Sequence, residues 1–349
     1  DAMESRGLGD VYKRQELTVP PLWIEFSTPP QPEETELLFL EVPWEILAND
    51  AGHLAASHLK FTPIRRFGDP GDPQAPSEYR LSLLFMAAAP RKSTSLDFEA
   101  EENAILTAAS QGGVDLSVEE SGNLELLSNR LAREQHTDVL HISCHGYNQP
   151  RPVLLLESPE GDAAAASPDE FAQEIGEHKP RLLFLSACLT SAANANTLLN
   201  SYAAELIRQG YPAVIGWAGS VMDGEATDFA AHLYRFLAKG NSLRHALATA
   251  RYQLLHPKTA QAALQPSQDW HLARLYLGKQ GGDKLTSGKR ARRLRPADYG
   301  HKEFLDSKGG KVPVASRHEF VGRRRAIQDI LREFRIFHYA GVLVHGFGR

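Results

Sequence analysis

The chain has 349 residues, of which 42% are hydrophobic and 23% charged, and its formal net charge is −5. These values are typical of a globular protein with one large α/β domain and part of another, and the acidic balance argues against a nucleic-acid partner. The longest apolar run, Leu83–Ala89, is too short to cross a bilayer, so no membrane role is expected. The chain has two cysteines, and we see no charged segment followed by an apolar one of the kind that directs secretion. Both features predict a cytoplasmic protein.

The first part of the chain carries few regular signals. Asp1–Gln15 lacks periodicity and hydrophobicity, and we interpret it as extraneous or disordered. From Leu17 to Glu41, proline-rich turns alternate with short apolar pieces such as Leu37–Leu40, which indicates strands at a sheet edge. Phe67–Ser77 has the turn residues of a loop.

From residue 80 onward, apolar strand-like runs alternate with helical patterns. Strands are predicted at 80–89, 114–118, 138–143, 153–157, 182–187 and 213–217. Helices are predicted at 96–109, 123–134, from Ser167, before Gly210, and at about 223–239 and 242–255. This alternation predicts an α/β fold with a mostly parallel central sheet and helices on both of its faces.

Two of the predicted strands end in chemically reactive residues. The run Arg181–Cys188 ends in a thiol, and the run Asp138–Gly146 ends in a His-Gly pair. Ligands of open α/β sheets bind at the carboxyl ends of the strands. If the two strands are neighbours, His145 and Cys188 meet at one sheet edge, and a thiol beside an imidazole is the minimal arrangement for nucleophilic acyl transfer.

The motifs HISCHG and LFLSAC, which contain His145 and Cys188, resemble the two catalytic motifs of CHAT-domain proteins, caspase-like cysteine peptidases related to separases and caspases. Val42–Leu47, Gly216–Gly240 and Leu243–Ala250 resemble further family segments in the same order, so the resemblance covers about Glu16 to Gly278.

The resemblance implies a caspase–haemoglobinase-like fold in a CHAT peptidase domain, residues 16–278. It also implies a cysteine endopeptidase that cleaves a protein or peptide substrate in a regulated bacterial signalling or defence system. No metal or organic cofactor is expected. The alternative is a non-catalytic signalling or assembly module with the same fold.

The resemblance also implies roles for individual residues. Cys188 is the expected nucleophile and His145 the base, while the N–H groups of Gly146 and Cys188 form an oxyanion hole. Trp217 is expected near the substrate-binding edge. Asp223 is a candidate for the specificity pocket, although a capping role at a helix start competes.

The position two residues before the cysteine bears on the substrate specificity. Related arginine- or lysine-specific enzymes can carry an acid there, whereas this chain has Ser186. A pocket without a buried acid favours an uncharged side chain before the scissile bond.

Three other interpretations of the thiols remain open at this stage. His141, Cys144, His145 and Cys188 could bind zinc, although strand alternation puts Cys144 on the other face from the histidines. Cys144 and Cys188 could form a disulfide. Alternatively, Cys188 could be an inert buried thiol in a flavodoxin-like binding fold.

The C-terminal part changes character. Residues 279–316 read as a flexible basic linker with the run Lys289–Arg293. Residues 317–349 contain an amphipathic helix and Gly341–Arg349, which resembles the entry to a STAND-type P-loop ATPase. The printed sequence stops before the lysine of that motif. We therefore expect no ATP binding by these residues, and nucleotide-dependent oligomerisation through the complete ATPase region.

Overall fold

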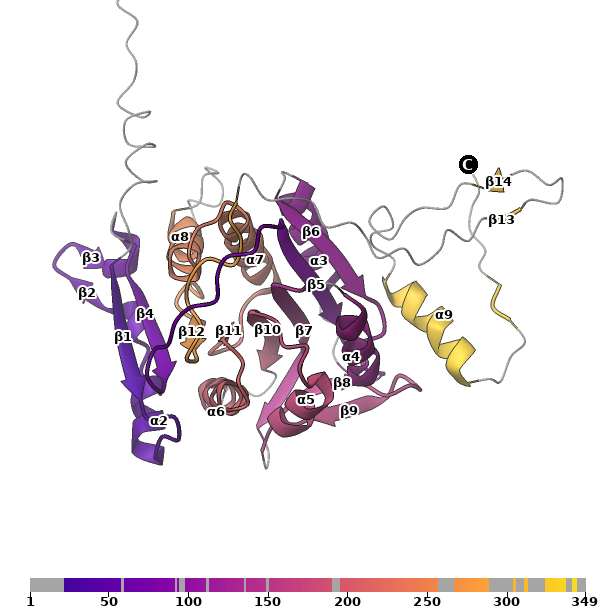
Figure 1. Ribbon diagram of the computed structural model, residues 1–349, viewed down its shortest axis with the longest axis horizontal. Helices are drawn as coiled ribbons and strands as arrows, with labels where there is room; N and C mark the ends of the chain where they lie inside the picture. The colour runs from indigo at the N-terminus through magenta and orange to yellow at the C-terminus, as the bar shows by residue number, and fades with distance from the viewer. Residues whose placement is uncertain are drawn as a thin grey trace, which may run out of the picture.

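A computed structural model of the chain describes residues 22–57, 60–91, 93, 98–110, 113–134, 136–148, 151–189, 195–256 and 267–288, with short pieces at 304–305, 311–312, 324–336 and 341–343. Its centre is a ten-stranded sheet (Figure 1). The main path runs β1 (Trp23–Thr28), β4 (Thr62–Phe67), β12 (Ala273–Leu277), β11 (Ala213–Trp217), β10 (Leu182–Leu189), β7 (Val139–Asn148), β5 (Leu81–Ala87) and β6 (Val114–Glu119).

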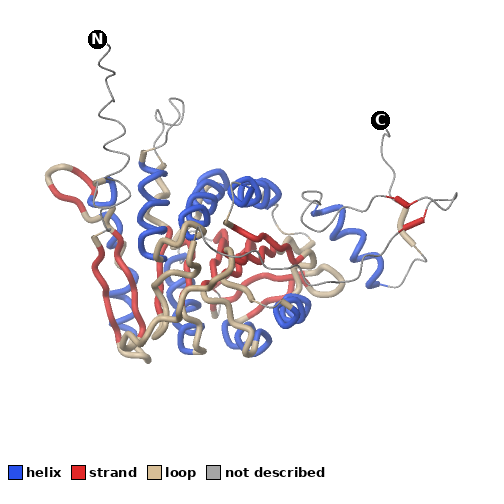
Figure 2. The backbone as a smooth tube through the Cα atoms, turned by 45° about the horizontal axis from the view of Figure 1, so that its top comes forward, coloured by secondary structure: helices blue, strands red, loops and turns tan. Residues whose placement is uncertain are grey.

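Most neighbouring strands on this path are parallel. The antiparallel exception on the path is β11 with β12. Off the path, β8 (Pro152–Glu157) pairs antiparallel with β7, and β9 (Ala163–Ala166) pairs antiparallel with β8. Helices cover both faces of the sheet, as Figure 2 shows from a second angle. The predicted α/β fold class, with a mostly parallel sheet between helices, is therefore confirmed.

The two faces of the sheet carry two hydrophobic clusters. One cluster packs the sheet against α3 (Phe98–Ser110), α7 (Asp223–Leu237) and α8 (Leu243–Leu255). The other packs it against α4 (Leu124–Arg133), α5 (Pro168–Ile175) and α6 (Ala195–Arg208). Because both faces are buried, the central strands read as continuous apolar runs rather than as alternating patterns.

Several local signals are confirmed in detail. Ser167 caps α5, with Glu170 completing the capping box and Pro168 in the first turn. Gly210 and Gly240 follow helices with φ of +91° and +78°, a conformation that glycine adopts at little cost.

Other predictions are wrong in their bounds or type. The apolar piece Leu37–Leu40 lies in a helix, α2 (Glu34–Glu41), which a capping box between Glu33 and Glu36 starts. β7 does not stop at its His-Gly pair, because β8 pairs with it as far as Asn148. β10 likewise runs one residue past Cys188. The sequence prediction also missed β4 and β12. In the predicted linker, residues 285–287 pair with Ser77 and Lys284 pairs with Ser242.

A buried ionic cluster joins β4, β12 and α8 to the segment after α2. Glu45 is fully buried and accepts two hydrogen bonds from Arg65, at 2.7 and 3.1 Å, and one from Arg251 at 3.2 Å. Arg274 lies 4.0 Å away. Burial raises the pKa of Glu45, but the charges of Arg65 and Arg251 outweigh this effect and hold the pKa below 4.5.

The C-terminal helix α9 (Arg324–Ile336) confirms the predicted amphipathic helix and contacts the domain beside β8. Gln328 donates a hydrogen bond to Glu157 Oε1 at 3.1 Å, and Arg332 Nη2 lies 3.3 Å from Glu157 Oε2. Glu157 is 3% exposed. The contact is close at Gly161, where any Cβ would collide with the Arg332 side chain.

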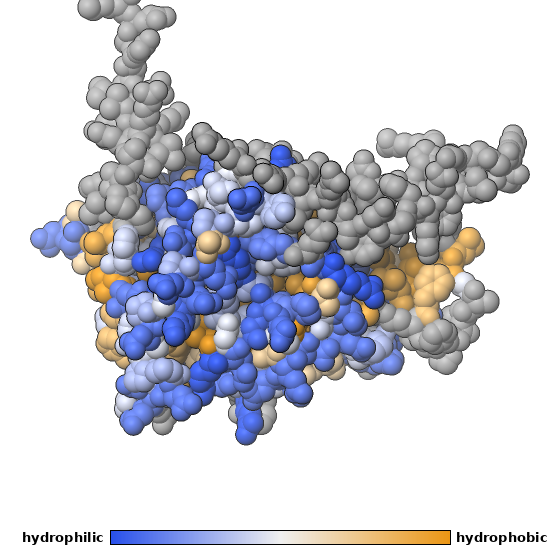
Figure 3. Space-filling model, in the orientation of Figure 1, coloured by the Kyte–Doolittle hydropathy of each residue, from blue (hydrophilic) through white to orange (hydrophobic). Residues whose placement is uncertain are grey.

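The surface in Figure 3 is mostly hydrophilic, with hydrophobic residues gathered beside β1 at the left edge. Leu22, Trp23 and Ile24 are all more than 40% exposed there. Among the described helices, none has the length and apolar character that a bilayer crossing requires.

We predict that Glu45→Gln destabilises the fold by about 3–5 kcal/mol, because it leaves buried guanidinium groups without their carboxylate. Since the folded-state pKa of Glu45 is lowered, its stabilisation is present above pH 4.5 and is lost as the pH falls through the folded value. Urea unfolding at pH 7 and below pH 4.5 measures both effects, and the difference between wild type and variant should shrink in acid. The exposed substitution Glu174→Gln is the control, and an equal loss in both variants would contradict the prediction.

We also predict that Arg332→Ala loosens α9. A hydrogen bond to a charged group contributes about 1.5–3 kcal/mol, so amide exchange in 324–336 should accelerate roughly tenfold or more. Hydrogen exchange with mass spectrometry measures this, with Glu333→Gln as the matched control on the same helix. Unchanged exchange in Arg332→Ala would show that the ion pair does not hold the helix.

Candidate active site

The pairing of β7 with β10 brings the two predicted reactive residues together. The strands are parallel neighbours in an eight-residue register that begins at Leu182↔Val139 and places Cys188 opposite His145. Neighbouring strands lie about 4.8 Å apart. The expectation that His145 and Cys188 meet at one edge of the sheet therefore agrees with the backbone of the structure.

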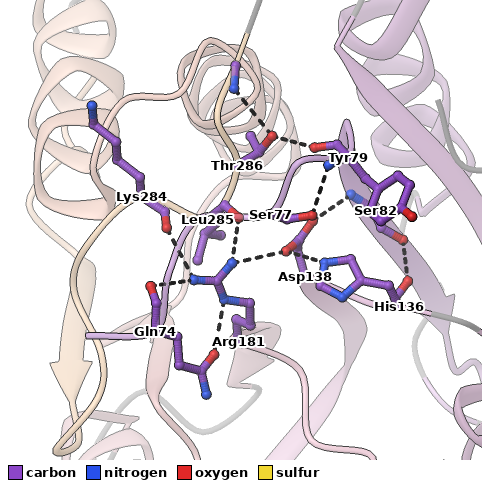
Figure 4. Close-up of polar contacts among 11 residues, drawn as sticks. Gln74, Ser77, Tyr79, Ser82, His136, Asp138, Arg181, Lys284, Leu285 and Thr286 are labelled. Atoms are coloured by element: carbon purple, nitrogen blue, oxygen red, sulfur yellow. Dashed lines mark hydrogen bonds and ion pairs between the residues drawn. The ribbon is translucent and has the colours of Figure 1, made fainter. Parts of the chain in front are cut away.

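A polar cluster at the other end of the two strands helps to fix this register (Figure 4). Asp138 is fully buried, its carbonyl accepts a hydrogen bond from Leu182 N–H at 2.9 Å, and its carboxylate lies 3.6 Å from Arg181. Arg181 also donates to the carbonyls of Leu285 at 2.6 Å and Gln74 at 3.0 Å. The start of β10 is thus tied to β7 and to the segment around residue 285.

His145 and Cys144 occupy opposite sides of β7. His145 is 2% exposed, and on the edge away from β10 it pairs with Leu155 of β8. Cys144 is fully buried in the hydrophobic cluster beneath α5 and α6, and its sulfur is not part of a disulfide. The disulfide interpretation is therefore wrong. Among the residues that the structure describes, no group of three His, Cys, Asp or Glu side chains could hold a metal ion.

A buried polar network lies on the α3 and α7 face of the sheet. Glu101 Oε1, from the first turns of α3, accepts a hydrogen bond from Ser186 Oγ at 2.8 Å and lies 3.1 Å from His141 Nε2. His141 Nδ1 lies 2.6 Å from the hydroxyl of Tyr234 on α7. His141 is thus a core histidine, and it links a carboxylate to a phenol.

The charges in this network follow from burial and hydrogen bonding. Burial raises the pKa of Glu101, but the charge and hydrogen bond of His141, with hydrogen bonds from Ser143 and Ser186, lower it below its usual value. Burial, together with the charge of Glu101, raises the pKa of Tyr234 well above 10. At neutral pH the network therefore holds an ionised carboxylate and a neutral phenol.

The remaining predicted site residues lie in different surroundings. Gly146 is buried and has strand partners on both sides, Leu189 and Leu154. Trp217 is 3% exposed, and its ring packs in the core at 5.0 Å from Phe229. A contact of Trp217 with substrate would therefore need its backbone rather than its ring.

Asp223 is exposed in the first turn of α7, where Met222 occupies the N-cap position. Its carboxylate is placed to interact favourably with the helix dipole, although it is not the capping residue itself.

Glu101 is the residue that sequence reasoning missed. Acids in the first turn of a helix, such as Glu99 and Glu101 of α3, are ordinarily explained by the helix dipole. Glu101, however, lies three residues after buried Phe98 and four before buried Ile105, so it occupies the apolar stripe of the helix. An acid on such a stripe signals a buried polar partner. The specificity prediction assumed a pocket without a buried acid. Glu101 removes this premise, because its carboxylate lies beside Ser186.

Among solved structures, the chain resembles the Arg-specific cysteine proteinase gingipain R with a TM-score of 0.46 and 8% identity, over 81% of this chain and 70% of that one. The complex of RgpB pro- and mature domains from Porphyromonas gingivalis gives 0.45 and 8%, over 81% and 71%. The Saccharomyces cerevisiae separase–securin complex gives 0.35 and 14%, over 69% of this chain and 15% of that one.

A search of curated proteins found no match. The family model of the CHAT domain, in contrast, matches residues 35–279, which is well over half of the chain and includes β7, β10 and the network around Glu101. The chain therefore belongs to the CHAT domain family.

Proposed function

We propose that the chain is a cysteine endopeptidase in which Cys188 is the nucleophile and His145 the general base. The observation that carries this proposal is the register of β7 and β10, which sets the two residues opposite each other on adjacent strands. Membership of the CHAT family supports the same reaction class. A thiol and an imidazole on neighbouring strand ends are sufficient for acyl transfer without a cofactor.

The reaction begins when the Cys188 thiol passes its proton to His145 and the thiolate attacks the carbonyl carbon of the scissile peptide bond. The carbon–nitrogen bond then breaks as the imidazolium gives its proton to the leaving amine, which leaves a thioester on Cys188. Water attacks the thioester while His145 takes a proton from it. The carbon–sulfur bond breaks, and the proton returns to the sulfur as the free acid leaves.

The negative oxygen of each tetrahedral intermediate needs hydrogen-bond donors. We assign this role to the N–H groups of Gly146 and Cys188. Gly146 suits the position because it has no side chain to obstruct the substrate carbonyl. Removal of one such donor typically costs 10²–10³ in kcat in enzymes of this kind.

A second candidate is a non-catalytic signalling or assembly module. The observation that favours it is the burial of His145, which is only 2% exposed. Labelling distinguishes the two functions. A peptide acyloxymethyl ketone that modifies Cys188 in a His145-dependent manner supports the peptidase, whereas a chain that is neither labelled nor active on a peptide library supports the module.

The finer proposal is that proteolysis is regulated by a downstream STAND-type P-loop ATPase in a bacterial signalling or defence system. The amphipathic helix α9 and its contact with Glu157 support a structured region after the peptidase domain. Gly346, where the phosphate loop is expected to begin, lies outside the described residues. Calorimetry with ATP tests the expectation that these 349 residues bind no nucleotide, and micromolar binding would contradict it.

We predict that Cys188→Ala abolishes peptide cleavage and that His145→Ala lowers it by about 10²–10⁴-fold, the range that general base catalysis contributes. Both variants should keep the wild-type circular dichroism spectrum and unfolding midpoint. Cleavage rates on a peptide library measure the loss. A folded His145→Ala variant with most of its activity would refute the base assignment.

We predict that Cys144→Ser keeps at least about half of the wild-type activity per folded molecule, because Cys144 lies in the opposite hydrophobic cluster from the network around Glu101. Burying a hydroxyl there costs about 1–3 kcal/mol of stability. Thermal unfolding and the cleavage rate, measured on the same sample, separate the two effects. A stable but inactive variant would assign Cys144 a chemical role.

A further inference from the structure

The Glu101 network lies directly below the two proposed catalytic residues on their own strands. Ser186 is two residues before Cys188 on β10, and Ser143 is two residues before His145 on β7, where the register also pairs Ser186 with Ser143. A strand repeats its facing every two residues, and two residues span about 7 Å. Positions 186 and 143 therefore face the same side of the sheet as positions 188 and 145, and the network lies two residues closer to the amino ends of the strands.

Glu101 joins three elements at this level. Its Oε1 accepts from Ser186 of β10 at 2.8 Å and contacts His141 of β7 at 3.1 Å, while the carboxylate itself comes from α3. Ser143 adds a hydrogen bond from β7. Tyr234 holds the other nitrogen of His141 from α7. One carboxylate thus bridges side chains of β10 and β7 just before the reactive ends of the two strands.

Glu101 is the acceptor at the centre of the network, and its lowered pKa keeps it ionised at neutral pH. Because a carboxylate only accepts, the hydrogen bond with Ser186 is donated by the serine hydroxyl, and a hydrogen between Glu101 and His141 belongs to His141 Nε2. The titratable groups that the structure describes in this network are Glu101, His141 and Tyr234. Cys144 and Tyr202 belong to the cluster on the opposite face.

We propose that Glu101 is a positioning residue for the proposed Cys188–His145 pair. It ties β10 to β7 two residues before the pair, and its negative charge shifts the pH range in which the pair titrates. This inference rests on the proposed peptidase function, and it assigns Glu101 no contact with the substrate. The hydrogen bond from Ser186 and the negative charge of Glu101 can be tested separately, because a different variant removes each of them.

The charge is tested by Glu101→Gln in a Cys144→Ser background. The chain has two cysteines, so Cys188 is then its single thiol and its alkylation by iodoacetamide can be followed alone. A nearby negative charge raises the pKa of a thiol and of an imidazole alike, so its removal should shift the midpoint of the pH–rate curve downward. For charges about 7 Å apart, the shift is about 0.4 to 1.7 pH units.

A second measurement keeps the charge test decisive if Cys188 reacts slowly. The titration of His145 by nuclear magnetic resonance should move to lower pH in Glu101→Gln by a similar amount. Glu99→Gln is the matched control, because it removes one half-buried carboxylate from the first turn of the same helix. Unchanged midpoints for both Cys188 and His145 in Glu101→Gln, or an equal shift in Glu99→Gln, would overturn the charge role.

The bridge is tested by Ser186→Ala, which keeps the charge and removes the hydrogen bond to β10. We expect kcat to fall about tenfold with KM changed less than twofold and the pH midpoint unchanged. If Glu101→Gln fails to fold, this variant still decides the positioning role. A folded Ser186→Ala enzyme with the wild-type kcat would overturn it.

Failure of the proposed function is recognised separately. If the wild-type chain neither cleaves peptides nor reacts with an acyloxymethyl ketone, the peptidase assignment fails, whatever Glu101 does. The alkylation and resonance midpoints still measure the charge effect in that case. A downward shift would support the electrostatic half of the inference, and no shift would refute it.

Discussion

The site depends on the parallel pairing of β7 with β10. A slip of one residue in this register would move every side chain of β10 to the other face of the sheet and would separate Cys188 from His145. The register is held at both ends by different chemistry. Asp138 and Arg181 act at the amino ends of the strands, and Glu101 with Ser186 acts near the carboxyl ends. The apolar residues between them supply the burial but leave the exact alignment to these polar contacts.

Two buried carboxylates, Glu45 and Glu101, solve the same physical problem in different ways. Each loses its hydration, which raises its pKa, and each regains more from its neighbours than it loses. Glu45 is surrounded by arginines that stay charged at any physiological pH. Glu101 instead contacts a histidine and two hydroxyls, whose protons can rearrange. The first arrangement suits a fixed structural joint, and the second places an ionised carboxylate close to the proposed catalytic pair, where its field can act.

Sequence reasoning located the strands that carry the site because their apolar runs are long and are bounded by turn residues. It also found the Ser167 cap and the glycines after α6 and α7, since these are local signals. It failed in two ways. The apolar piece in α2 resembles a strand until the Glu33–Glu36 box, itself a local signal, is recognised. The continuation of β7 instead depends on tertiary context, because it pairs with β8, a partner that the local pattern does not show.

The same limit explains the missed partner of Ser186. Reading along β10 shows a serine two residues before Cys188, but the acid beside it comes from α3, 85 positions earlier in the chain. Only the packing of α3 on this face places Glu101 there. The signal in the sequence, an acid on an apolar helix stripe, says that a partner exists and does not say which strand supplies it.

Glu157 gives the fold a thermodynamic link between its C-terminal helix and the end of β5. Its Oε1 accepts hydrogen bonds from both Gln328 of α9 and the backbone N–H of Ala89, two residues beyond β5, while Arg332 contacts Oε2. Because one buried carboxylate serves both sides, the free energy of docking α9 and that of ordering residue 89 contain a shared term. Such coupling is reciprocal. Any event that undocks α9 therefore makes the ordered state of the strand end less stable. Any ligand that orders the strand end raises the docking equilibrium constant of α9 by the same factor.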